Sequence, residues 1–545
     1  MFDNQHKHWN AWGHTQVSYP ISEDAVSFLK STLGQVTPLP SATLKDALNS
    51  IRQSRFSDHF LKDMQALDLQ IDVSSETRLR HAHGQSFLDW LVLRSGQLKE
   101  VPDGVIFPVS TEEVEKIIHC ADRHGVHIIP YGGGTSVVGH LSVLANQKQV
   151  LSLSMARMTR LISLDPVSRI ARFLAGVSGP LLESQLEPHG FTLGHFPQSF
   201  EFSTLGGWVV TRSSGQQSLG YGRIEQLFAG GTCVTPIGKL DIKPIPASST
   251  GPDLREIILG SEGRMGVLTE ALVRISKRPE QEQFVTYLCS DWQTAVQAVQ
   301  KLVQQKIPLS MLRLSNPQET QINLLLSGKK QQVLWLKRYL KFRGMVSNPC
   351  MLMVGYSGFK TQVCASIKQL KVALKEFDVL SLGRYLGQKW KTHRFLSPYL
   401  RASLWDLGYG VDTLETAVNW DLVPSLVQEI ESALKNACAQ QGISVLPFTH
   451  LSHFYNQGSS IYTTYIFPHA ANYEDTRVRW QTLKNAASRA IVERGGTISH
   501  HHGVGVDHQS YLVHEKSPLG VSAIQAIIQH FDPHQIMNPH KLVGF

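Results

Sequence analysis

The chain has 545 residues, a formal net charge of +8 and 42% hydrophobic residues. This length predicts two or three domains, and the hydrophobic content predicts folded cores rather than global disorder. The positive charge suits phosphate-bearing ligands or anionic membrane surfaces. Because Lys and Arg form no long run, nucleic acid is the weaker interpretation.

Several classes of protein are excluded by what the sequence lacks. The six cysteines include no CxxC pair, which excludes a cysteine zinc knuckle and a redox dithiol, and so long a chain is not expected to carry a disulfide framework. The first residues form no apolar signal sequence, no run of about 18 apolar residues predicts a transmembrane helix, and the final LVGF is not an SKL-type peroxisomal address. We therefore expect a cytoplasmic protein, with peripheral membrane contact left open.

The first predicted elements are helices followed by one strand. Residues 43–56 predict a helix. Further on, Ser110 as N-cap and Glu113 at N3 predict a capping box, and apolar residues at helical spacing continue to Gly125. The apolar VHIIP at 126–130 then predicts a short buried strand.

The pattern of elements changes further along the chain. Short β-rich runs such as VLSLS at 150–154 alternate with Gly and Pro, which is typical of an α+β domain. Beyond SKRPEQEQ, near residue 278, predicted helices at 292–305 and 473–494 alternate with strands such as 462–467. The predicted division is an N-terminal helical region (1–101), a first α+β domain (102–278) and a second α+β domain (279–545).

A glycine triplet, Gly132 to Gly134, follows the strand at 126–130 and precedes Thr135 and Ser136. Glycines there can adopt positive φ and bring backbone N–H groups close to an anion such as a pyrophosphate. The spacing matches neither GxGxxG nor GxxxxGK[ST], so a Rossmann site and a P-loop are not supported, and a plain tight turn stays the alternative. Two further glycine–hydroxyl turns, at 198–215 and 260–263, favour one extended ligand with a diphosphate and a flat ring.

Seven stretches of the chain carry a family resemblance. They are PYGGGTSV (130–137), SFEFSTLGGW (199–208), TRSSG (211–215), TGPDL (250–254), GSEGRMGVLTEA (260–271), SIYTTY (460–465) and GGTISHHHGVG (495–505). In order and over nearly the whole chain, they resemble flavoproteins of the vanillyl-alcohol oxidase type, and within them the alkyldihydroxyacetonephosphate synthase family. The resemblance implies an α+β fold, with a PCMH-type FAD-binding domain, a second α+β cap (FAD-linked oxidase C-terminal) domain, and a final segment that returns to the flavin.

The resemblance implies FAD as a non-covalent cofactor, because Thr135 stands where covalent relatives carry the attaching histidine. The implied cofactor-binding residues are Pro130, Tyr131, Gly132, Gly133, Gly134, Thr135, Ser136, Gln198, Ser199, Glu201, Ser203, Thr204, Gly207, Thr211, Arg212, Ser213, Ser214, Glu262, Gly263, Gly266 and Val267. Two positions depart from the family pattern. Gln198 stands where the family usually has Asp, and Arg264 with Met265 replaces the usual Thr-Leu.

The resemblance also implies a catalytic set. Tyr462 and Arg313 match family residues needed for activity, and Arg401 more loosely matches a substrate-binding arginine. A packed strand tyrosine and surface ion pairs are the alternatives for these residues. In the tail, His540 and Lys541 either approach the flavin or substrate, or simply follow the end of the last helix.

The run His500, His501 and His502 matches the family's histidines, and histidine is the usual acid–base group near neutral pH. If the segment is extended, His500 and His502 face one side and His501 the other, so one or two line the pocket while another packs behind. The alternative is a metal site with further ligands from His450, His453 or His508. The lack of HExxH spacing argues against it, and we expect no metal.

The implied reaction is an alkyl transfer of ether-lipid synthesis without net electron transfer. A fatty alcohol replaces the acyl group of acyl-dihydroxyacetone phosphate, and flavin N5 traps the substrate carbon as the carboxylate leaves. The implied partner is therefore a small lipid phosphate. An FAD-linked oxidase or dehydrogenase of a hydroxy acid or alcohol stays the alternative, a flavin-binding protein without activity is third, and the sequence leaves a homodimer open.

Overall fold

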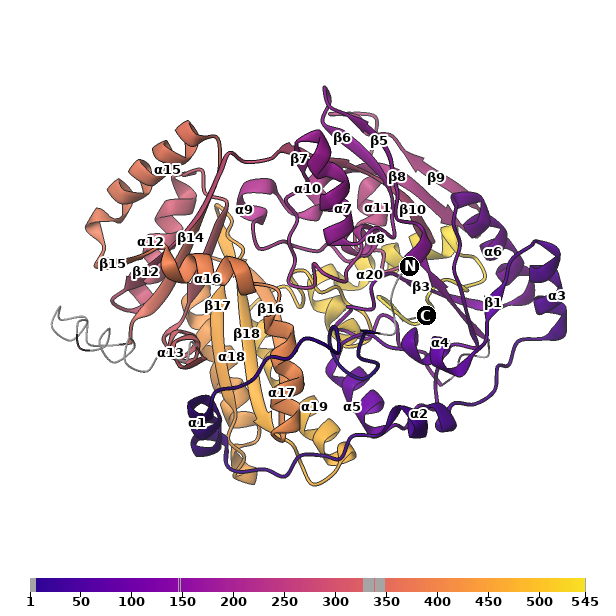
Figure 1. Ribbon diagram of the computed structural model, residues 1–545, viewed down its shortest axis with the longest axis horizontal. Coiled ribbons are helices and arrows are strands. Elements are labelled where there is room, and N and C mark those ends of the chain that lie inside the picture. The colour runs from indigo at the N-terminus through magenta and orange to yellow at the C-terminus, as the bar shows by residue number, and fades with distance from the viewer. Residues whose placement is uncertain (1–5, 146, 148, 327–337, 339–347, 545) are drawn as a thin grey trace.

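The computed structural model describes residues 6–145, 147, 149–326, 338 and 348–544. Two lobes lie side by side (Figure 1). The first lobe spans residues 71–274 and contains a four-stranded and a five-stranded sheet, and the second lobe spans 281–468 and contains one seven-stranded sheet. Helices accompany every sheet, so the predicted α+β class is confirmed.

The two large sheets of the first lobe differ in strand direction. The four-stranded sheet has the order β1 (Ile71–Asp72), β2 (Gly104–Ile106), β4 (Val150–Ser154) and β3 (His127–Tyr131). The five-stranded sheet has the order β5 (Leu161–Asp165), β6 (Ile170–Leu174), β10 (Val267–Arg274), β8 (Phe228–Thr235) and β9 (Gly238–Ile242), and β7 (Phe191–Thr192) pairs separately with β11 (Ser276–Lys277). Strands β2, β3 and β4 pair in parallel, whereas the five-stranded sheet is antiparallel.

The helices of the first lobe are mostly short. They are α6 (Thr111–His124), α7 (Gly179–Leu186), α8 (Leu205–Val210), α9 (Ser218–Tyr221), α10 (Ile224–Leu227) and α11 (Arg255–Ile258). The predicted helix with Ser110 as N-cap and Gly125 at its end is present as α6. Its Glu113 carboxylate accepts a hydrogen bond from the Val109 N–H rather than from Ser110, so the expected capping box is completed one residue earlier.

The seven-stranded sheet of the second lobe is antiparallel throughout. Its strands, in order, are β15 (Val379–Gly383), β12 (Gln281–Cys289), β14 (Cys350–Gly358), β13 (Met311–Ser315), β17 (Leu446–Leu451), β18 (Gly458–Pro468) and β16 (Tyr409–Asn419). Its helices are α12 (Trp292–Gln304), α13 (Pro317–Leu326), α15 (Lys360–Ala373), α16 (Tyr385–His393), α17 (Leu400–Asp406), α18 (Val423–Ala437) and α19 (Tyr473–Glu493). The predicted elements at 292–305, 462–467 and 473–494 correspond to α12, β18 and α19.

The seven-stranded sheet has two distinct faces, because successive strand residues point to opposite sides. On β18, Ile461, Tyr465 and Phe467 pack into a large core with α12, α15, α18 and α19. Tyr462, Thr464 and Ile466 line a cavity on the other face, together with residues of α13, α16 and α17.

The N-terminal region crosses both lobes. Its helices are α1 (Glu23–Leu33), α2 (Leu44–Ser50), α3 (Asp58–Ala66), α4 (Ser75–Arg80) and α5 (Phe87–Ser95). The predicted helix over 43–56 was wrong beyond Ser50. Asp103 accepts hydrogen bonds from the Arg52 and Arg55 side chains and from the Arg55 backbone N–H, which holds this stretch in an extended conformation.

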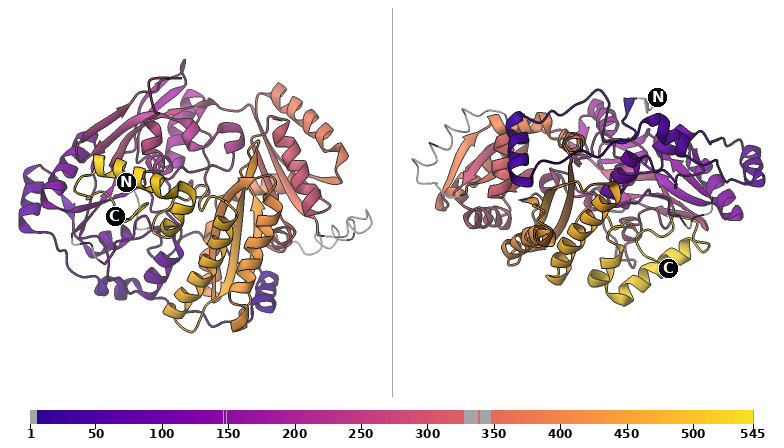
Figure 2. Two further views of the ribbon diagram at one scale, coloured as in Figure 1. Left: turned by 180° about the vertical axis from the view of Figure 1, so that it is seen from behind. Right: turned by 90° about the horizontal axis from the view of Figure 1, so that it is seen from below.

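The C-terminal segment lies against the first lobe (Figure 2). It contains α20 (Leu512–Phe531), which bends at Ser517, where φ is 58° and Pro518 follows. After α20, Ile536 and Met537 join the hydrophobic core of the first lobe, and Met537 forms a bridge with Ile128 of β3. None of the helices in the described part of the chain combines the length and apolar character that crossing a membrane requires.

Candidate active site

A cavity of about 680 Å³ lies where the two lobes meet. The glycine loop after β3 and the turns of the first lobe line one end. The free face of the seven-stranded sheet lines the other end, with α13, α16, α17 and α1 around it. One continuous space therefore joins the glycine turns to the histidine run.

The glycine loop packs too closely on a neighbouring segment for any other residue. A Cβ at Gly133 would overlap the Phe202 carbonyl oxygen, and one at Gly132 would lie 2.5 Å from Thr204 Oγ1. Gly134 has a φ of 71°, which other residues rarely adopt. The loop and the 198–215 segment thus form a cradle of exposed backbone, which fits the diphosphate of a dinucleotide such as FAD.

Most of the predicted cofactor-binding residues line this cavity. They are Pro130, Tyr131, Gly132, Gly133, Gly134, Thr135, Ser136, Gln198, Ser199, Ser203, Thr204, Gly207, Thr211, Ser213, Glu262, Gly263, Gly266 and Val267. The other three residues predicted to bind the cofactor, Glu201, Arg212 and Ser214, do not line the cavity. The Arg212 guanidinium pairs with Glu256, and Ser214 Oγ lies 3.2 Å from His453 Nδ1.

Glu262 lines the cavity, but its carboxylate is used elsewhere. Its two oxygens accept hydrogen bonds from the backbone N–H groups of Val504 (2.5 Å) and Gly505 (2.9 Å). His140 Nε2 lies 3.0 Å from the same carboxylate. Glu262 therefore holds the loop after the histidine run in place.

The two departures from the family pattern have structural roles. Gln198 Nε2 donates to Ser397 Oγ, which connects the first lobe to the segment before α17. Arg264 is completely buried and donates to the Met537 carbonyl at 2.7 Å, while Met265 packs against α20 and the tail. Arg264 and Met265 thus fasten the C-terminal segment onto the first lobe.

Tyr462 is held at the centre of the sheet face. It lies opposite His450 of β17 and opposite Glu415 of β16. Its ring stacks on the His450 ring with centroids 4.7 Å apart. Burial raises the pKa of Tyr462 above its usual range, so the phenol is protonated at neutral pH.

Arg313 is paired within the cavity. Its Nη2 donates to Glu319 Oε1 of α13 at 2.7 Å, and His450 Nδ1 lies 3.1 Å from the same oxygen. Burial alone would raise the pKa of Glu319, but His450 and Arg313 lower it to about 2. Glu319 is therefore ionised and orients Arg313.

Arg401, on α17, is placed differently. Its Nη1 donates to the Gln85 carbonyl, and its guanidinium lies 4.5 Å from the centre of the Trp90 ring. Within the described residues, Nε and Nη2 are buried and have no hydrogen-bond partner. A buried guanidinium that lines the cavity with free N–H groups is suited to an anionic group of a ligand.

The histidine run is bent, so the predicted opposition of His501 to His500 and His502 was wrong. Residues 498, 500, 501 and 502 are bends, and the three rings gather around one carboxylate. His501 and His502 line the cavity, whereas His500 packs behind them. Burial lowers the pKa of His501 and His502 to about 3 and that of His500 to about 4, so all three are neutral at pH 7.

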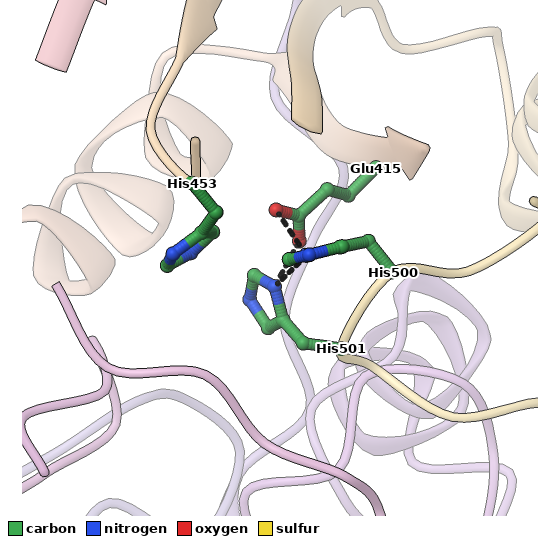
Figure 3. A group of neighbouring side chains, drawn as sticks. All are labelled: Glu415, His453, His500 and His501. Atoms are coloured by element: carbon green, nitrogen blue, oxygen red, sulfur yellow. Dashed lines mark hydrogen bonds and ion pairs between the residues drawn. The ribbon is translucent and has the colours of Figure 1, made fainter. Parts of the chain in front are cut away.

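The carboxylate at the centre belongs to Glu415, which the sequence analysis missed. Figure 3 shows it directed at the rings of His500 and His501. Its oxygens lie 3.3 Å from His500 Nδ1 and 2.5 Å from His501 Nδ1, and the side chain is fully buried. The histidine nitrogens lie within ion-pair distance of the carboxylate, but neither Glu415 oxygen has a hydrogen-bond partner of good geometry among the described residues. The sequence carries one signal for Glu415. The alternation of DTLET along β16 places Glu415 on the same face of the sheet as Thr413.

Glu415, His453, His500 and His501 also have the composition of a metal site, with one ligand atom from each within 4.8 Å of the others. The contacts of His500 argue against it. Arg223 Nη1, which can only donate, lies 3.0 Å from His500 Nε2. His500 Nε2 is therefore the acceptor, and the ring proton is on Nδ1, which faces Glu415 and is not free to bind an ion. Of the other histidines considered for a metal site, His508 Nδ1 contacts the Gly503 carbonyl, and His450 Nδ1 contacts Arg313 and Glu319.

The tail residues His540 and Lys541 do not line the cavity. Lys541 is fully buried, and its Nζ donates to the Ser142 carbonyl at 2.8 Å. Nearby, Asn538 does line the cavity, and its Nδ2 donates to the Glu262 carbonyl. The tail thus reaches the cavity through Asn538, which the sequence analysis did not select.

Two family profiles match the chain. The FAD binding domain matches residues 102–241, and the C-terminal domain of FAD linked oxidases matches residues 278–542. The fold and the cavity therefore belong to a flavoprotein of the FAD-linked oxidase class, and the predicted cofactor, FAD, is confirmed.

Similar proteins define the family more narrowly. Alkyldihydroxyacetonephosphate synthase of Dictyostelium discoideum is 32% identical over 89% of this chain and 80% of its own length, and that of Caenorhabditis elegans is 30% identical over 98% and 95%. A solved structure of alkyldihydroxyacetonephosphate synthase superposes with a TM-score of 0.85 at 28% identity, covering 99% of both chains. The chain belongs to the alkyldihydroxyacetonephosphate synthase family.

Proposed function

We propose that this protein is an alkyldihydroxyacetonephosphate synthase, which exchanges the acyl group of acyl-dihydroxyacetone phosphate for a fatty alcohol. One observation carries the proposal. A single cavity joins a backbone cradle for a dinucleotide, a cluster of buried acid–base groups and an apolar chamber. A lipid phosphate requires both the acid–base cluster and the apolar chamber. A small hydroxy acid has no long alkyl chain to place in the chamber.

FAD would be held non-covalently, with its diphosphate on residues 132–136. When bound, the flavin supplies the ring nitrogen at which the substrate carbon is held. The protein itself supplies proton transfer, binding of anions and exclusion of water. Denaturation in acid should release all the flavin into solution. Flavin that stays with the precipitated chain would contradict non-covalent binding.

The chain's own groups divide the remaining work. Tyr462, protonated and directed into the cavity, is the group that exchanges a proton with the reacting carbon. His501, a neutral imidazole that lines the same cavity, is the second acid–base group. Its Nδ1 faces a Glu415 oxygen at 2.5 Å and His500 Nδ1 at 3.1 Å, so that Nε2 is the nitrogen left for the substrate. His502, whose ring lies edge-to-face with the Tyr462 ring with centroids 6.0 Å apart, and His500 behind it complete the cluster.

The two arginines bind the charged parts of the substrate. The Arg401 Nε and Nη2 groups, which have no partner among the residues that the structure describes, bind the phosphate or the leaving carboxylate. Arg313 is already paired with Glu319, which fixes its direction and leaves its other N–H groups for the second anion. In this arrangement both ends of the polar headgroup are held while the acyl carboxylate departs.

A direct assay separates this proposal from an FAD-linked oxidase or dehydrogenase. Acyl-dihydroxyacetone phosphate and hexadecanol are mixed with the holoenzyme under anaerobic conditions, and ether product and flavin absorbance are followed together. We expect ether product and a flavin that is oxidised after turnover. Complete bleaching by a hydroxy acid, with no ether product, would establish the dehydrogenase.

The Tyr462→Phe variant tests the site assignment within the same assay. It should lower the exchange rate by at least about 10²-fold, the usual contribution of a positioned acid–base group, while FAD occupancy is unchanged. Tyr465→Phe is the matched control, because Tyr465 lies on the same strand but packs into the core behind the sheet. Retained exchange in Tyr462→Phe would refute the role of Tyr462.

Three further proposals concern the domains and the assembly of the protein. They are the domain boundaries at residues 102 and 279, a homodimer, and peripheral contact with a membrane surface. Sedimentation of the holoenzyme and co-sedimentation with anionic phospholipid vesicles test the last two. A monomer at all concentrations, or no binding to vesicles, would contradict them.

A further inference from the structure

The apolar end of the cavity has a separate wall that the acid–base groups do not touch. This wall is formed by one face of the seven-stranded sheet and by three helices from different parts of the chain. Its residues include Ala25, Leu29, Ile322, Leu404, Leu446 and Ile466. They belong to one hydrophobic cluster, distinct from the large cores of the two lobes, except for Ala25, which lines the same space.

The sheet face that lines the cavity changes from polar to apolar along the paired strands β17 and β18. Across β17 and β18, His450 lies opposite Tyr462, Phe448 opposite Thr464, and Leu446 opposite Ile466. Tyr462 and Ile466 are separated by about 13 Å at ~3.3 Å per strand residue. With C–C bonds of about 1.5 Å in a zigzag, roughly ten carbons of an extended alkyl chain cover this distance. A longer chain must therefore meet whatever lies beyond Ile466.

What lies beyond Ile466 is α1. Figures 1 and 2 show this helix beside the end of the orange strands, apart from the other helices of the N-terminal region. Tyr409, at the start of β16, donates to the Gly34 carbonyl after α1 at 2.6 Å, and Ser403 of α17 donates to the Tyr19 carbonyl before α1 at 2.7 Å. Both ends of α1 are thus fixed to the second lobe.

One face of α1 is turned to the cavity. Ala25 and Leu29 are buried, Phe28 is half-buried, and all three line the space. Ser27, on the opposite face, is exposed. Ser22 caps the helix by accepting from the Ala25 N–H at 3.3 Å, so the position of Ala25 is set by the first turn.

We propose that α1 is the end stop of the alkyl-chain chamber and that Ala25 and Phe28 set the longest chain the enzyme accepts. The inference rests on the proposed function for the identity of the ligand. The small Ala25 side chain lines the space, and the half-buried Phe28 lines it too and packs against the cluster that contains Ile466. A larger residue at 25 shortens the chamber, and a smaller residue at 28 lengthens it.

The test uses the holoenzyme and a series of saturated primary alcohols from dodecanol to eicosanol. Binding is measured by displacement of cis-parinaric acid, and exchange is measured with the same alcohols. In Ala25→Phe the optimum should move to shorter alcohols, with about fourfold weaker binding for each methylene that no longer fits. In Phe28→Ala the optimum should move to longer alcohols. Ser27→Leu is the matched control on the exposed face and should leave the profile unchanged.

The outcomes separate the end stop from the proposed function. Alcohol binding whose length profile follows residues 25 and 28, without ether product from any variant, supports the end stop and refutes the synthase. Ether product with a length profile that Ala25→Phe and Phe28→Ala leave unchanged supports the synthase and overturns the end stop. Equal weakening of all alcohols in Ala25→Phe, at unchanged thermal stability, also overturns it.

Discussion

The two ends of the cavity recognise their ligands by different physical means. The cofactor end is built from backbone, with glycines where side chains would collide with Phe202 or Thr204. The catalytic end is built from side chains whose protonation is set by burial and by the charges of Glu415, Glu319 and Arg223. Shape therefore controls the first end and charge controls the second, so isosteric changes should be harmless at one and damaging at the other.

The largest expected effect is at the cofactor end. Gly133→Ala should abolish FAD binding, because the added Cβ overlaps the Phe202 carbonyl and the loop must move to admit it. The ratio of flavin to protein absorbance after purification measures the loss. Gly520→Ala, on α20 with no atom closer than 3.4 Å to the new Cβ, is the control. Full FAD occupancy in Gly133→Ala would show that the cradle is not rigid.

At the catalytic end, the corresponding change keeps shape and removes charge. Glu415→Gln should lower kcat by about 10²-fold, because His501 loses the carboxylate that holds its Nδ1 side. Glu415 does not line the cavity and acts on the substrate only through the histidines around it, so KM for the alcohol should change little. Glu431→Gln is the matched control, since Glu431 is on α18 behind the sheet and accepts from Thr449 and Asn316. A change in KM with constant kcat would contradict the positioning role.

The same contrast explains what the sequence could and could not predict. Glycine turns and hydroxyls are local features, so most of the residues selected at 130–136 and 198–215 do line the cavity, and their contact with the cofactor stays a prediction. Arg212 was an exception because its guanidinium reaches Glu256, a choice that depends on the packing of α11. Glu415 was missed because its role arises only when β16 pairs with β18 and the run at 500–502 folds over both. Because of the bend there, His502 lies on the cavity side with His501 rather than with His500.

A third, smaller effect concerns stability rather than activity. Burial raises the pKa of Asp507 to about 7, compared with 3.8 when exposed. An acid with a raised folded pKa stabilises the fold below its unfolded pKa, and this contribution is lost as pH rises through the folded pKa. Between pH 5.5 and 8.5 the loss amounts to at most about 2 kcal/mol of unfolding free energy.

Asp507→Asn should remove that loss. Relative to the unsubstituted protein, the variant should gain stability as pH rises from 5.5 to about 7 and then keep a constant difference up to pH 8.5, measured by urea unfolding followed by tryptophan fluorescence. Asp68→Asn, at an exposed position with a φ of 60° that Asn tolerates, is the control and should show a constant difference. A variant whose relative stability falls as pH rises would mean that ionised Asp507 is stabilised by the charges around it.

The smallest expected effect tests the electrostatic account of the histidine cluster itself. If the Glu415 carboxylate is surrounded by neutral imidazoles rather than bound to an ion, dialysis of the holoenzyme against EDTA should leave exchange activity and FAD content unchanged. The reason is the tautomer of His500, whose Nε2 accepts from Arg223 and whose Nδ1 therefore carries the proton facing Glu415. Elemental analysis of the same sample provides the independent readout. Stoichiometric zinc, together with activity that EDTA removes and zinc restores, would show that Arg223 is displaced from His500 in solution and that the four-residue cluster is a metal centre.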